Sequence, residues 1–260
     1  MTNSALHAIE QLLASGKPEE VRRGLELVRQ ELATIGSGEV RPLFEMVSTL
    51  FYIDTFDRPD LAPLMEEAIS LLVSFGTWVI PALISNLNAG DLKAQMAIAQ
   101  ALGRMGDDVI EPLLAEYQSS PDPAKRSFVL YALGKIKSPA IVKAASFAIE
   151  SADSPDLELR DTATRAIGKF AESISPSDLS EEMRRGFIEK LQRALADSNP
   201  GIRAKAVRSL GKLARFGHLN SKEREKLKAT LLLILGNDEQ FEWDRAYIVR
   251  REAEEALHYV

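Results

Sequence analysis

Histidines and carboxylates are the residues of this sequence that could perform acid–base or metal chemistry. The chain contains three histidines, His7, His218 and His258, and no cysteine. The histidines are far apart and none has a second metal ligand at helical spacing, so we interpret them as surface or capping residues. Carboxylate pairs such as Asp107 and Asp108 fit a helix start or a charged helix face. The sequence therefore predicts no catalytic residue, no metal site and no cofactor.

Basic side chains recur around four glycines, Gly103, Gly134, Gly168 and Gly211. The positions three before and one after each glycine are four residues apart, so they share a helix face. Along the chain these positions hold Gln100 and Arg104, Tyr131 and Lys135, Arg165 and Lys169, and Arg208 and Lys212. We define the basic ladder as seven of these residues: Arg104, Tyr131, Lys135, Arg165, Lys169, Arg208 and Lys212.

The basic ladder has two interpretations. A row of cations on successive helices would bind an acidic segment of a partner protein, with Tyr131 adding apolar contact. Alternatively, a cation beside the glycine only keeps an exposed helix face soluble and pairs with neighbouring carboxylates. The chain has a net charge of −6, which argues against nucleic acid or an anionic membrane as the partner. The binding interpretation therefore predicts a protein partner.

Internal repeats indicate which elements carry the ladder. The segment that starts at Gly76 aligns with the segment that starts at Gly106, which gives a period of 30 residues. Each repeat contains two apolar stripes at helical spacing, separated by turn residues such as "SSPDP". Each repeat is therefore a pair of helices, A and B, and the ladder lies on the B helices. We predict an all-α fold, a right-handed α–α superhelix (solenoid) of about seven helix pairs.

The repeat register gives the expected bounds of these pairs. They are 4–14 with 19–33, 39–53 with 61–75, the aligned repeats 76–105 and 106–136, and then 139–170, 179–216 and 221–260. Residues 1–260 are expected to form one solenoid, with irregular repeats at 1–75, the clearest repeats at 76–217 and a capping repeat at 218–260. Ser177 or Ser180 is expected to cap a helix of the sixth pair. The charged final helix predicts a monomer or weak dimer.

The four glycines need a physical reason, because glycine inside a helix costs about 1 kcal/mol relative to alanine. A small residue stands two positions before each one: Ala101, Ala132, Ala166 or Ser209. We interpret glycine and small residue as a site where a neighbouring helix approaches closely. Alternatively, each glycine only ends its helix. On the first interpretation, Ala132→Leu or Ala166→Leu would overpack the interface and cost about 1 to 3 kcal/mol.

The segment "DSNPGIRAKAVRSLGKLARFG" resembles the second half of a HEAT repeat, in the short form also seen in bilin-lyase (phycobilisome lyase) subunits. The matching residues are Asp197, Pro200, Arg203, Ala206, Leu210 and Gly211. An arginine eight residues before the glycine recurs as Arg126, Arg160 and Arg203, whereas Gln95 departs from the pattern. The last helix keeps Arg250 but has His258 in place of glycine. The resemblance implies that this arginine, with an aspartate such as Asp197 or Asp244, holds the turn between helices A and B.

Three functions are compatible with these observations. We expect a non-enzymatic scaffold or adaptor that binds an acidic segment on its concave face. The resemblance implies an alternative, a subunit of a lyase-like complex acting on a protein-bound tetrapyrrole, and a less favoured one, DNA binding as in HEAT-like alkylpurine glycosylases. The first residues fit a capped helix rather than a leader, and the apolar runs are shorter than the roughly 20 residues of a membrane span. We therefore expect a cytoplasmic protein.

Aromatic residues give a second candidate surface. Phe51, Tyr52 and Phe56 cluster in "LFYIDTFDRPD" and are either core residues of an irregular repeat or an exposed partner patch. Trp78 and Trp243 are expected to open helices and to serve as packing anchors.

Overall fold

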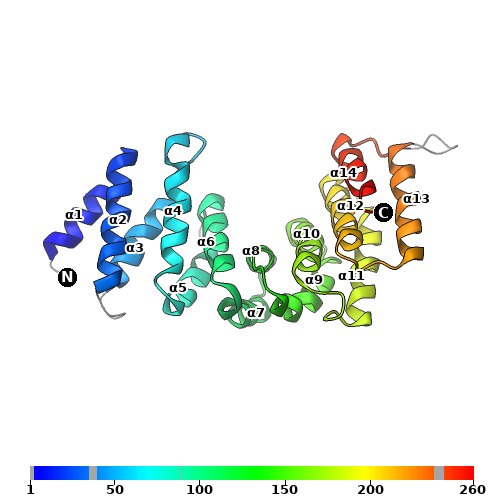
Figure 1. Ribbon diagram of the computed structural model, residues 1–260, viewed down its shortest axis with the longest axis horizontal. Coiled ribbons are helices and arrows are strands. Elements are labelled where there is room, and N and C mark those ends of the chain that lie inside the picture. Colours follow the sequence, from blue (N-terminus) through cyan, green and yellow to red (C-terminus); the bar gives the residue numbers. More distant parts are fainter. Residues whose placement is uncertain (1–2, 35–39, 89, 237–242) are drawn as a thin grey trace. The chain divides into compact units, whose positions relative to one another are not determined.

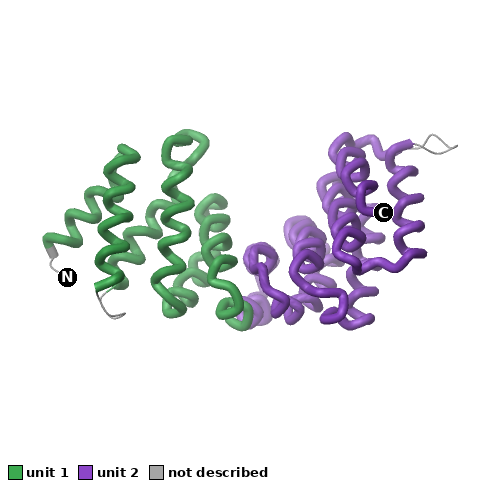
Figure 2. The backbone as a smooth tube through the Cα atoms, viewed as in Figure 1, with its two compact units in different colours: residues 1–112 green, residues 113–260 purple. Residues whose placement is uncertain are grey.

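The structure is a computed structural model that describes residues 3–34, 40–88, 90–236 and 243–260. These ranges form fourteen α-helices, joined by turns and short 3₁₀ segments, and contain no strand (Figure 1). The expected all-α repeat fold is therefore confirmed. The chain divides into two compact units, Met1–Pro112 and Leu113–Val260 (Figure 2). The single solenoid and its right hand stay predictions.

Unit 1 contains the first three helix pairs. They are α1 (Asn3–Leu13) with α2 (Pro18–Thr34), α3 (Arg41–Thr49) with α4 (Ala62–Val73), and α5 (Ile80–Ser85) with α6 (Leu92–Arg104). Short 3₁₀ segments flank them at Leu50–Tyr52, Pro59–Leu61, Thr77–Val79 and Asn86–Asn88. Helix α4 packs between α2 and α6, so the second helices of the three pairs form one layer.

Unit 2 repeats this arrangement. Helix α7 (Ile110–Ser119), preceded by a 3₁₀ segment at Gly106–Val109, begins at the end of unit 1 and continues into unit 2. It is followed by α8 (Pro123–Leu133), α9 (Ala145–Ser151, after the 3₁₀ segment Pro139–Ala144), α10 (Leu157–Ser173), α11 (Glu181–Ala194), α12 (Pro200–Arg215), α13 (Ser221–Leu235) and α14 (Tyr247–Leu257). Helices α8, α10, α12 and α14 pack side by side in this order. The seven predicted helix pairs are present.

Polar caps begin the second helix of most pairs. Asp91, Asp122, Asp156 and Asn199 accept hydrogen bonds from backbone N–H groups of the first turns of α6, α8, α10 and α12. Such a cap satisfies donors that have no partner within the helix. Ser180 caps α11 by accepting from the Met183 N–H, so the second of the two expected serines is the cap.

The turn arginines, Arg126, Arg160, Arg203 and Arg250, confirm the structural role that the resemblance implies. Each donates a hydrogen bond to the backbone carbonyl six residues earlier, at 2.7 or 2.8 Å. Two of them also bind the aspartate of the next turn: Arg160 donates to Asp197 at 2.8 Å, and Arg203 donates to both carboxylate oxygens of Asp244. In the third helix pair Gln95 stands in place of the arginine, and its buried side chain donates a hydrogen bond to the Leu87 carbonyl at 3.0 Å.

Two of the repeated glycines, Gly168 and Gly211, allow close helix approach. A Cβ on Gly168 would lie 2.7 Å from the Cβ of Ser209, and one on Gly211 would lie 2.9 Å from the Cβ of Ala256. Ser209 stands two positions before Gly211, and Ala256 stands two positions before His258, which occupies the glycine position of the last repeat. Gly134 instead ends α8, with φ of −66°, and a Cβ there would meet only ordinary contacts. Ala132 and Ala166 are buried, as the close-approach interpretation requires.

His218 and Trp243 have different outcomes. His218 is buried at 1% exposure and its Nε2 hydrogen-bonds the Ala171 carbonyl in the last turn of α10, so it fits the capping role rather than the surface one. Burial lowers its pKa and favours the neutral ring. Trp243 is 63% exposed and precedes α14 by four residues, so it is not a packing anchor. Trp78 does pack edge-on against Phe44 and Phe75.

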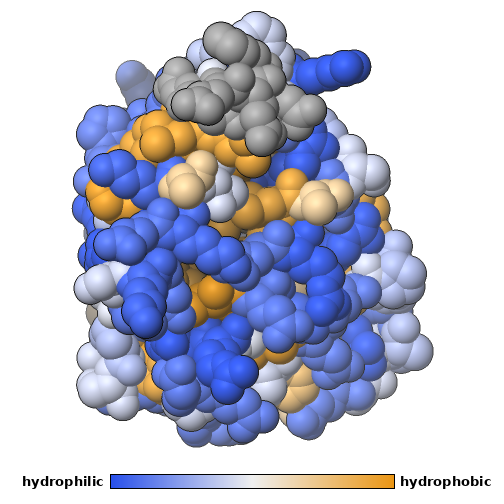
Figure 3. Space-filling model, turned by 90° about the vertical axis from the view of Figure 1, so that its right-hand side faces the viewer, coloured by the Kyte–Doolittle hydropathy of each residue, from blue (hydrophilic) through white to orange (hydrophobic). Residues whose placement is uncertain are grey.

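The last helix pair has a mixed surface. Hydrophilic side chains cover most of the face shown in Figure 3, with hydrophobic ones between them. On α14, Arg251, Glu254 and Glu255 are exposed, as a capping repeat requires, but Tyr247 and Ile248 are exposed as well. The expected monomer or weak dimer stays a prediction.

No single helix within the described ranges has both the length and the apolar character to cross a membrane. One pair of segments meets the length and composition criteria only when the two are taken together: Pro59–Val73 and Thr77–Ser85. The two segments are bent by 106° from each other.

The two kinds of glycine environment give a matched stability test. Gly168→Ala places a methyl group inside contact distance of Ser209 backbone and side chain, so we expect the free energy of unfolding to fall by about 1 to 3 kcal/mol. Gly134→Ala meets no such obstacle and should leave stability unchanged or raise it by less than about 1 kcal/mol. Urea denaturation of both variants measures the difference. Equal effects of the two substitutions would contradict the close-approach interpretation.

Candidate functional site

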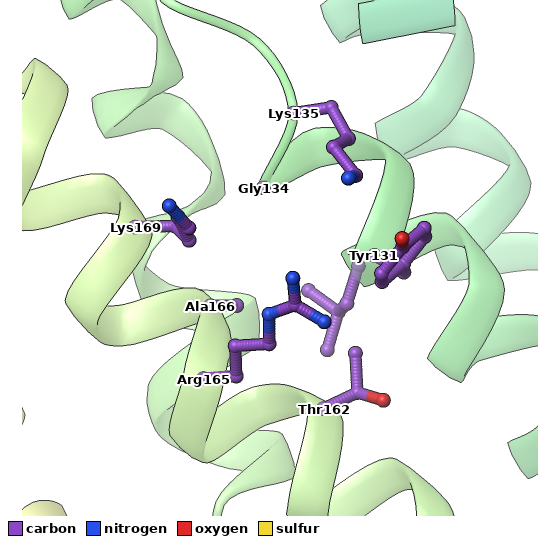
Figure 4. Close-up of a pocket in the computed structure, with 8 residues that line it drawn as sticks. Tyr131, Gly134, Lys135, Thr162, Arg165, Ala166 and Lys169 are labelled. Carbon is purple, nitrogen blue, oxygen red and sulfur yellow. The ribbon is translucent and has the colours of Figure 1, made fainter. Parts of the chain in front are cut away.

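Three residues of the basic ladder gather where α8 packs on α10. Tyr131 lies on the last turn of α8, Lys135 follows the end of that helix, and Arg165 lies on α10. The Lys135 ammonium is 4.9 Å from the centre of the Tyr131 ring, and the Arg165 guanidinium carbon is 5.1 Å from it. Figure 4 shows both cationic side chains extending toward the ring from their separate elements. We call these three residues the Tyr131 cluster.

The two cations of the Tyr131 cluster differ from the rest of the ladder in their partners. Among the residues that the structure describes, neither Lys135 nor Arg165 has a carboxylate oxygen within 4.0 Å. Their charges therefore face only the π-electrons of Tyr131 and solvent. Cation–π contacts of this kind contribute about 0.5 to 1 kcal/mol at exposed sites, enough to orient the side chains without neutralising them.

A narrow crevice, with space for about one water molecule, lies beside the cluster. It is lined by Leu130, Tyr131, Gly134, Lys135, Thr162, Arg165, Ala166 and Lys169 (Figure 4). Small or apolar residues of α8 and α10 form part of this lining, and the other lining residues carry cations and two hydroxyls. The crevice is too small to enclose a side chain, so an anion would contact the cations at its rim.

Glu172 contacts two further ladder residues. Its carboxylate receives Lys169 at 3.1 Å and Lys212 at 2.5 Å, and also Lys137, which lies outside the ladder, at 3.0 Å. Burial alone would raise the pKa of Glu172, but hydrogen bonds from Lys212, Lys137 and Lys169 outweigh it and lower the pKa to about 2. Glu172 is therefore ionised throughout the physiological pH range, and it joins α10 to α12.

Arg208 and Arg104 are also paired with carboxylates. Arg208 donates to both oxygens of Glu252, a buried residue of α14, and this pair lowers the pKa of Glu252. In unit 1, Arg104 binds Glu66 of α4 and donates to the Ser70 hydroxyl at 2.8 Å. These two cations therefore join neighbouring second helices.

The structure thus divides the predicted ladder. Four cations pair with carboxylates, as the solubility interpretation expects, and the Tyr131 cluster keeps two unpaired cations, as the binding interpretation requires. The carboxylates Glu66, Glu172 and Glu252 were not identified from the sequence. Only the Lys169–Glu172 pair has a sequence signal, because its members are three residues apart on one helix. The other pairs join residues at least 35 positions apart.

The arrangement can bind an anion but has no recognisable catalytic machinery in the part of the chain that the structure describes. No group of three or more His, Asp or Glu side chains within those ranges could hold a metal ion. His7 and His258 lie on the surface. His7 is hydrogen-bonded to Gln11, and His258 is hydrogen-bonded to the Glu255 carbonyl. The Tyr131 cluster itself offers two cations and an aromatic ring for contact with negative charge.

Comparison with known proteins confirms the expected resemblance to HEAT-like repeats. Residues 94–119, from α6 through α7, match the family of PBS lyase HEAT-like repeats. A curated relative, phycocyanobilin lyase subunit beta of Thermosynechococcus vestitus, is 31% identical over 132 residues. That match covers 50% of this chain and 61% of the relative.

Solved structures share the fold at low sequence identity. The complex of CpcE and CpcF of phycocyanin lyase from Nostoc sp. PCC7120 has a TM-score of 0.54 at 19% identity, over 70% of this chain and 99% of that chain. Kap121p bound to Nup53p has a TM-score of 0.61 at 14% identity, over 98% of this chain and 29% of that chain. An engineered protein covers 99% of this chain, and 96% of its own, with a TM-score of 0.51 at 19% identity. These similarities support the α-helical repeat architecture.

The Glu172 contacts predict a pH-dependent contribution to stability. Because the pKa is lowered in the folded state, the contribution is complete above the unfolded value of 4.5 and is lost as pH falls toward about 2. We expect Glu172→Gln to lower the free energy of unfolding by about 2 kcal/mol at neutral pH, and by less at about pH 3.5. Urea denaturation at both pH values measures this.

A matched control removes the same charge from an exposed site. Glu158 of α10 is exposed, so Glu158→Gln should change stability by less than about 0.5 kcal/mol at either pH. A loss of stability in Glu172→Gln that is equal at both pH values would mean that packing, not ionisation, sets its contribution.

Proposed function

We propose that this chain is a protein-binding scaffold whose Tyr131 cluster receives an acidic segment of a partner protein. The observation that supports this function is the pair of unpaired cations, Lys135 and Arg165, at 4.9 and 5.1 Å from the centre of the Tyr131 ring. Every other cation of the basic ladder contacts a carboxylate of this chain, and Lys169 and Lys212 share theirs, Glu172, with Lys137.

The physical argument concerns the cost of binding. A cation already paired with a carboxylate must lose that partner before it can bind another anion, whereas Lys135 and Arg165 have only a π contact to keep. The ring also limits the motion of both side chains, so less conformational entropy is lost when a ligand orders them. The Tyr131 cluster is therefore the part of the ladder where an incoming carboxylate gains most.

The aromatic ring adds a second kind of contact. Tyrosine and arginine are over-represented among the residues that dominate binding energy at protein interfaces. Tyr131 is half-buried between α8 and α10, so its position is set by the fold. An acidic segment that also carries an apolar or aromatic side chain would contact both the cations and the ring.

A labelled oligo-glutamate peptide that contains one tyrosine provides a direct test. We expect wild-type protein to raise its fluorescence anisotropy, with an affinity that falls as salt concentration rises. Lys135→Gln combined with Arg165→Gln should weaken binding about tenfold or more, because both charges that face the ligand are removed. Both side chains are surface groups, so the fold of the double variant should be retained.

The control removes two exposed cations outside the ladder. Lys222→Gln with Lys226→Gln on α13 changes the net charge equally and should leave the affinity within about twofold of wild type. If the two double variants bind the peptide equally well, binding reflects net charge, and the Tyr131 cluster is not the site.

The sequence relative favours a second candidate function. The match to phycocyanobilin lyase subunit beta, and the family match at residues 94–119, are compatible with a subunit of a complex that acts on a protein-bound tetrapyrrole. In that role the scaffold would hold a second lyase-like chain or the acceptor protein, and the chemistry would depend on the assembled complex.

Visible absorbance of purified complexes distinguishes this second candidate. If the chain belongs to a tetrapyrrole lyase, an affinity-tagged form purified from its native host should co-purify with another repeat subunit and carry visible absorbance. The same sample denatured in acidic urea should retain the tetrapyrrole spectrum. A purified complex without visible absorbance, which also fails to take up added phycocyanobilin, would contradict the lyase role and leave the scaffold function.

A further inference from the structure

Unit 1 exposes four large apolar side chains at one place, far along the chain from the Tyr131 cluster. Phe56 is 88% exposed, Leu92 61%, Tyr52 57% and Met96 44%. Tyr52 belongs to the 3₁₀ segment Leu50–Tyr52, which packs against α6, and Leu92 and Met96 lie one turn apart on α6. We call these four residues the aromatic-loop patch.

The loop that carries Phe56 is held against α6 by specific contacts. Lys93 of α6 forms an ion pair with Asp54, and its ammonium lies 5.6 Å from the centre of the Phe56 ring. The other oxygen of Asp54 accepts a hydrogen bond from the Phe56 N–H at 2.8 Å. The hydrogen bond from Lys93 lowers the pKa of Asp54, so this contact persists at neutral pH. Phe56 is therefore positioned beside Lys93, whose neighbours on the same stretch of α6 include Leu92 and Met96.

A second contact fixes the other end of the loop. Arg58 donates to the Gly16 carbonyl, in the turn between α1 and α2, at 2.5 Å. It also donates to both carboxylate oxygens of Asp60. The loop is thus bound at one end to α6 and at the other to the first helix pair. Holding an aromatic ring in solvent in this way gives no burial energy to the fold, but it lowers the entropy cost of binding a partner.

The charges around the patch indicate the chemistry of that partner. The loop and the start of α6 carry four carboxylates, Asp54, Asp57, Asp60 and Asp91, and two cations, Arg58 and Lys93, which leaves a net charge of −2. The cations are bound to Asp54 and Asp60. Asp57 is exposed and has no cation within 4.0 Å in the described part of the chain.

We propose that the aromatic-loop patch binds a protein segment with a large apolar side chain flanked by lysine or arginine. The apolar side chain would pack against Phe56, Leu92 and Met96, and a flanking cation would face Asp57. An acidic rim opposes binding to the anionic surface of a membrane, so a protein segment is the better match. This surface has the opposite charge preference to the Tyr131 cluster, so the two would select different partner segments.

Two synthetic helical peptides test the proposal. One carries leucine on one face and lysine on the other, and the second has glutamate in place of every lysine. We expect calorimetric titration to show tight binding of the lysine peptide and about tenfold weaker binding, or none, for the glutamate peptide. Phe56→Ser combined with Leu92→Ser should reduce affinity for the lysine peptide about tenfold, because the apolar anchors are lost.

Two further variants separate the causes. Asp57→Lys reverses the rim charge without changing an apolar side chain, and we expect it to weaken binding of the lysine peptide. Leu157→Ser on α10, which removes an exposed apolar residue of unit 2, should have no effect. Circular dichroism and thermal denaturation confirm that each variant is folded.

The outcomes that would overturn the proposal are distinct. Equal binding of the lysine peptide by wild type and the Phe56→Ser, Leu92→Ser double variant would place its site elsewhere. Equal binding of the two peptides would mean that the rim charges do not select the partner. If light scattering shows that the wild type self-associates and that the double variant does not, the patch is an interface between two copies of this chain.

Discussion

The turn arginines are the contacts on which the repeat spacing of unit 2 depends. Arg160 and Arg203 each bind a carbonyl of their own turn and the carboxylate of the following turn. Asp197 accepts from Arg160 through its carboxylate and from Arg203 through its backbone carbonyl. Asp244 accepts from Arg203 and Arg250 in the same way. The three arginines and two aspartates therefore form one continuous series. These charge-assisted bonds are partly buried, where they are stronger than in water. They hold each second helix at a fixed distance from the next.

The series ends at Arg126, and this end coincides with the candidate binding site. Ser154 occupies the position from which an aspartate would bind Arg126, and serine has no carboxylate. The Arg126 guanidinium lies over the Tyr117 ring instead. Tyr131 likewise stands where later repeats have arginine. Between α8 and α10, aromatic contacts therefore replace two of the ion pairs found further along unit 2, and the cations Lys135 and Arg165 remain available.

The sequence predicts the fold well because the repeat is a local pattern. Helical apolar spacing, the candidate cap at Ser180 and the arginine eight residues before the glycine are all read within about 30 residues, the length of one repeat. The two compact units, the burial of His218 and the exposure of Trp243 depend on contacts between distant segments. For the same reason, the sequence shows the recurring ladder positions but not the partners of its cations, Glu66, Glu172 and Glu252.

The Glu172 carboxylate changes how the repeats of unit 2 communicate. Repeat proteins are often described as linear arrays in which each repeat interacts only with its immediate neighbours. Glu172 binds lysines from three consecutive repeats: Lys137 after α8, Lys169 on α10 and Lys212 on α12. The three lysine contacts are not independent, because loss of one lysine alters the electrostatic interaction of the other two with Glu172. A charge change at any one of these three lysines therefore alters an electrostatic balance that α10, α12 and the segment after α8 share.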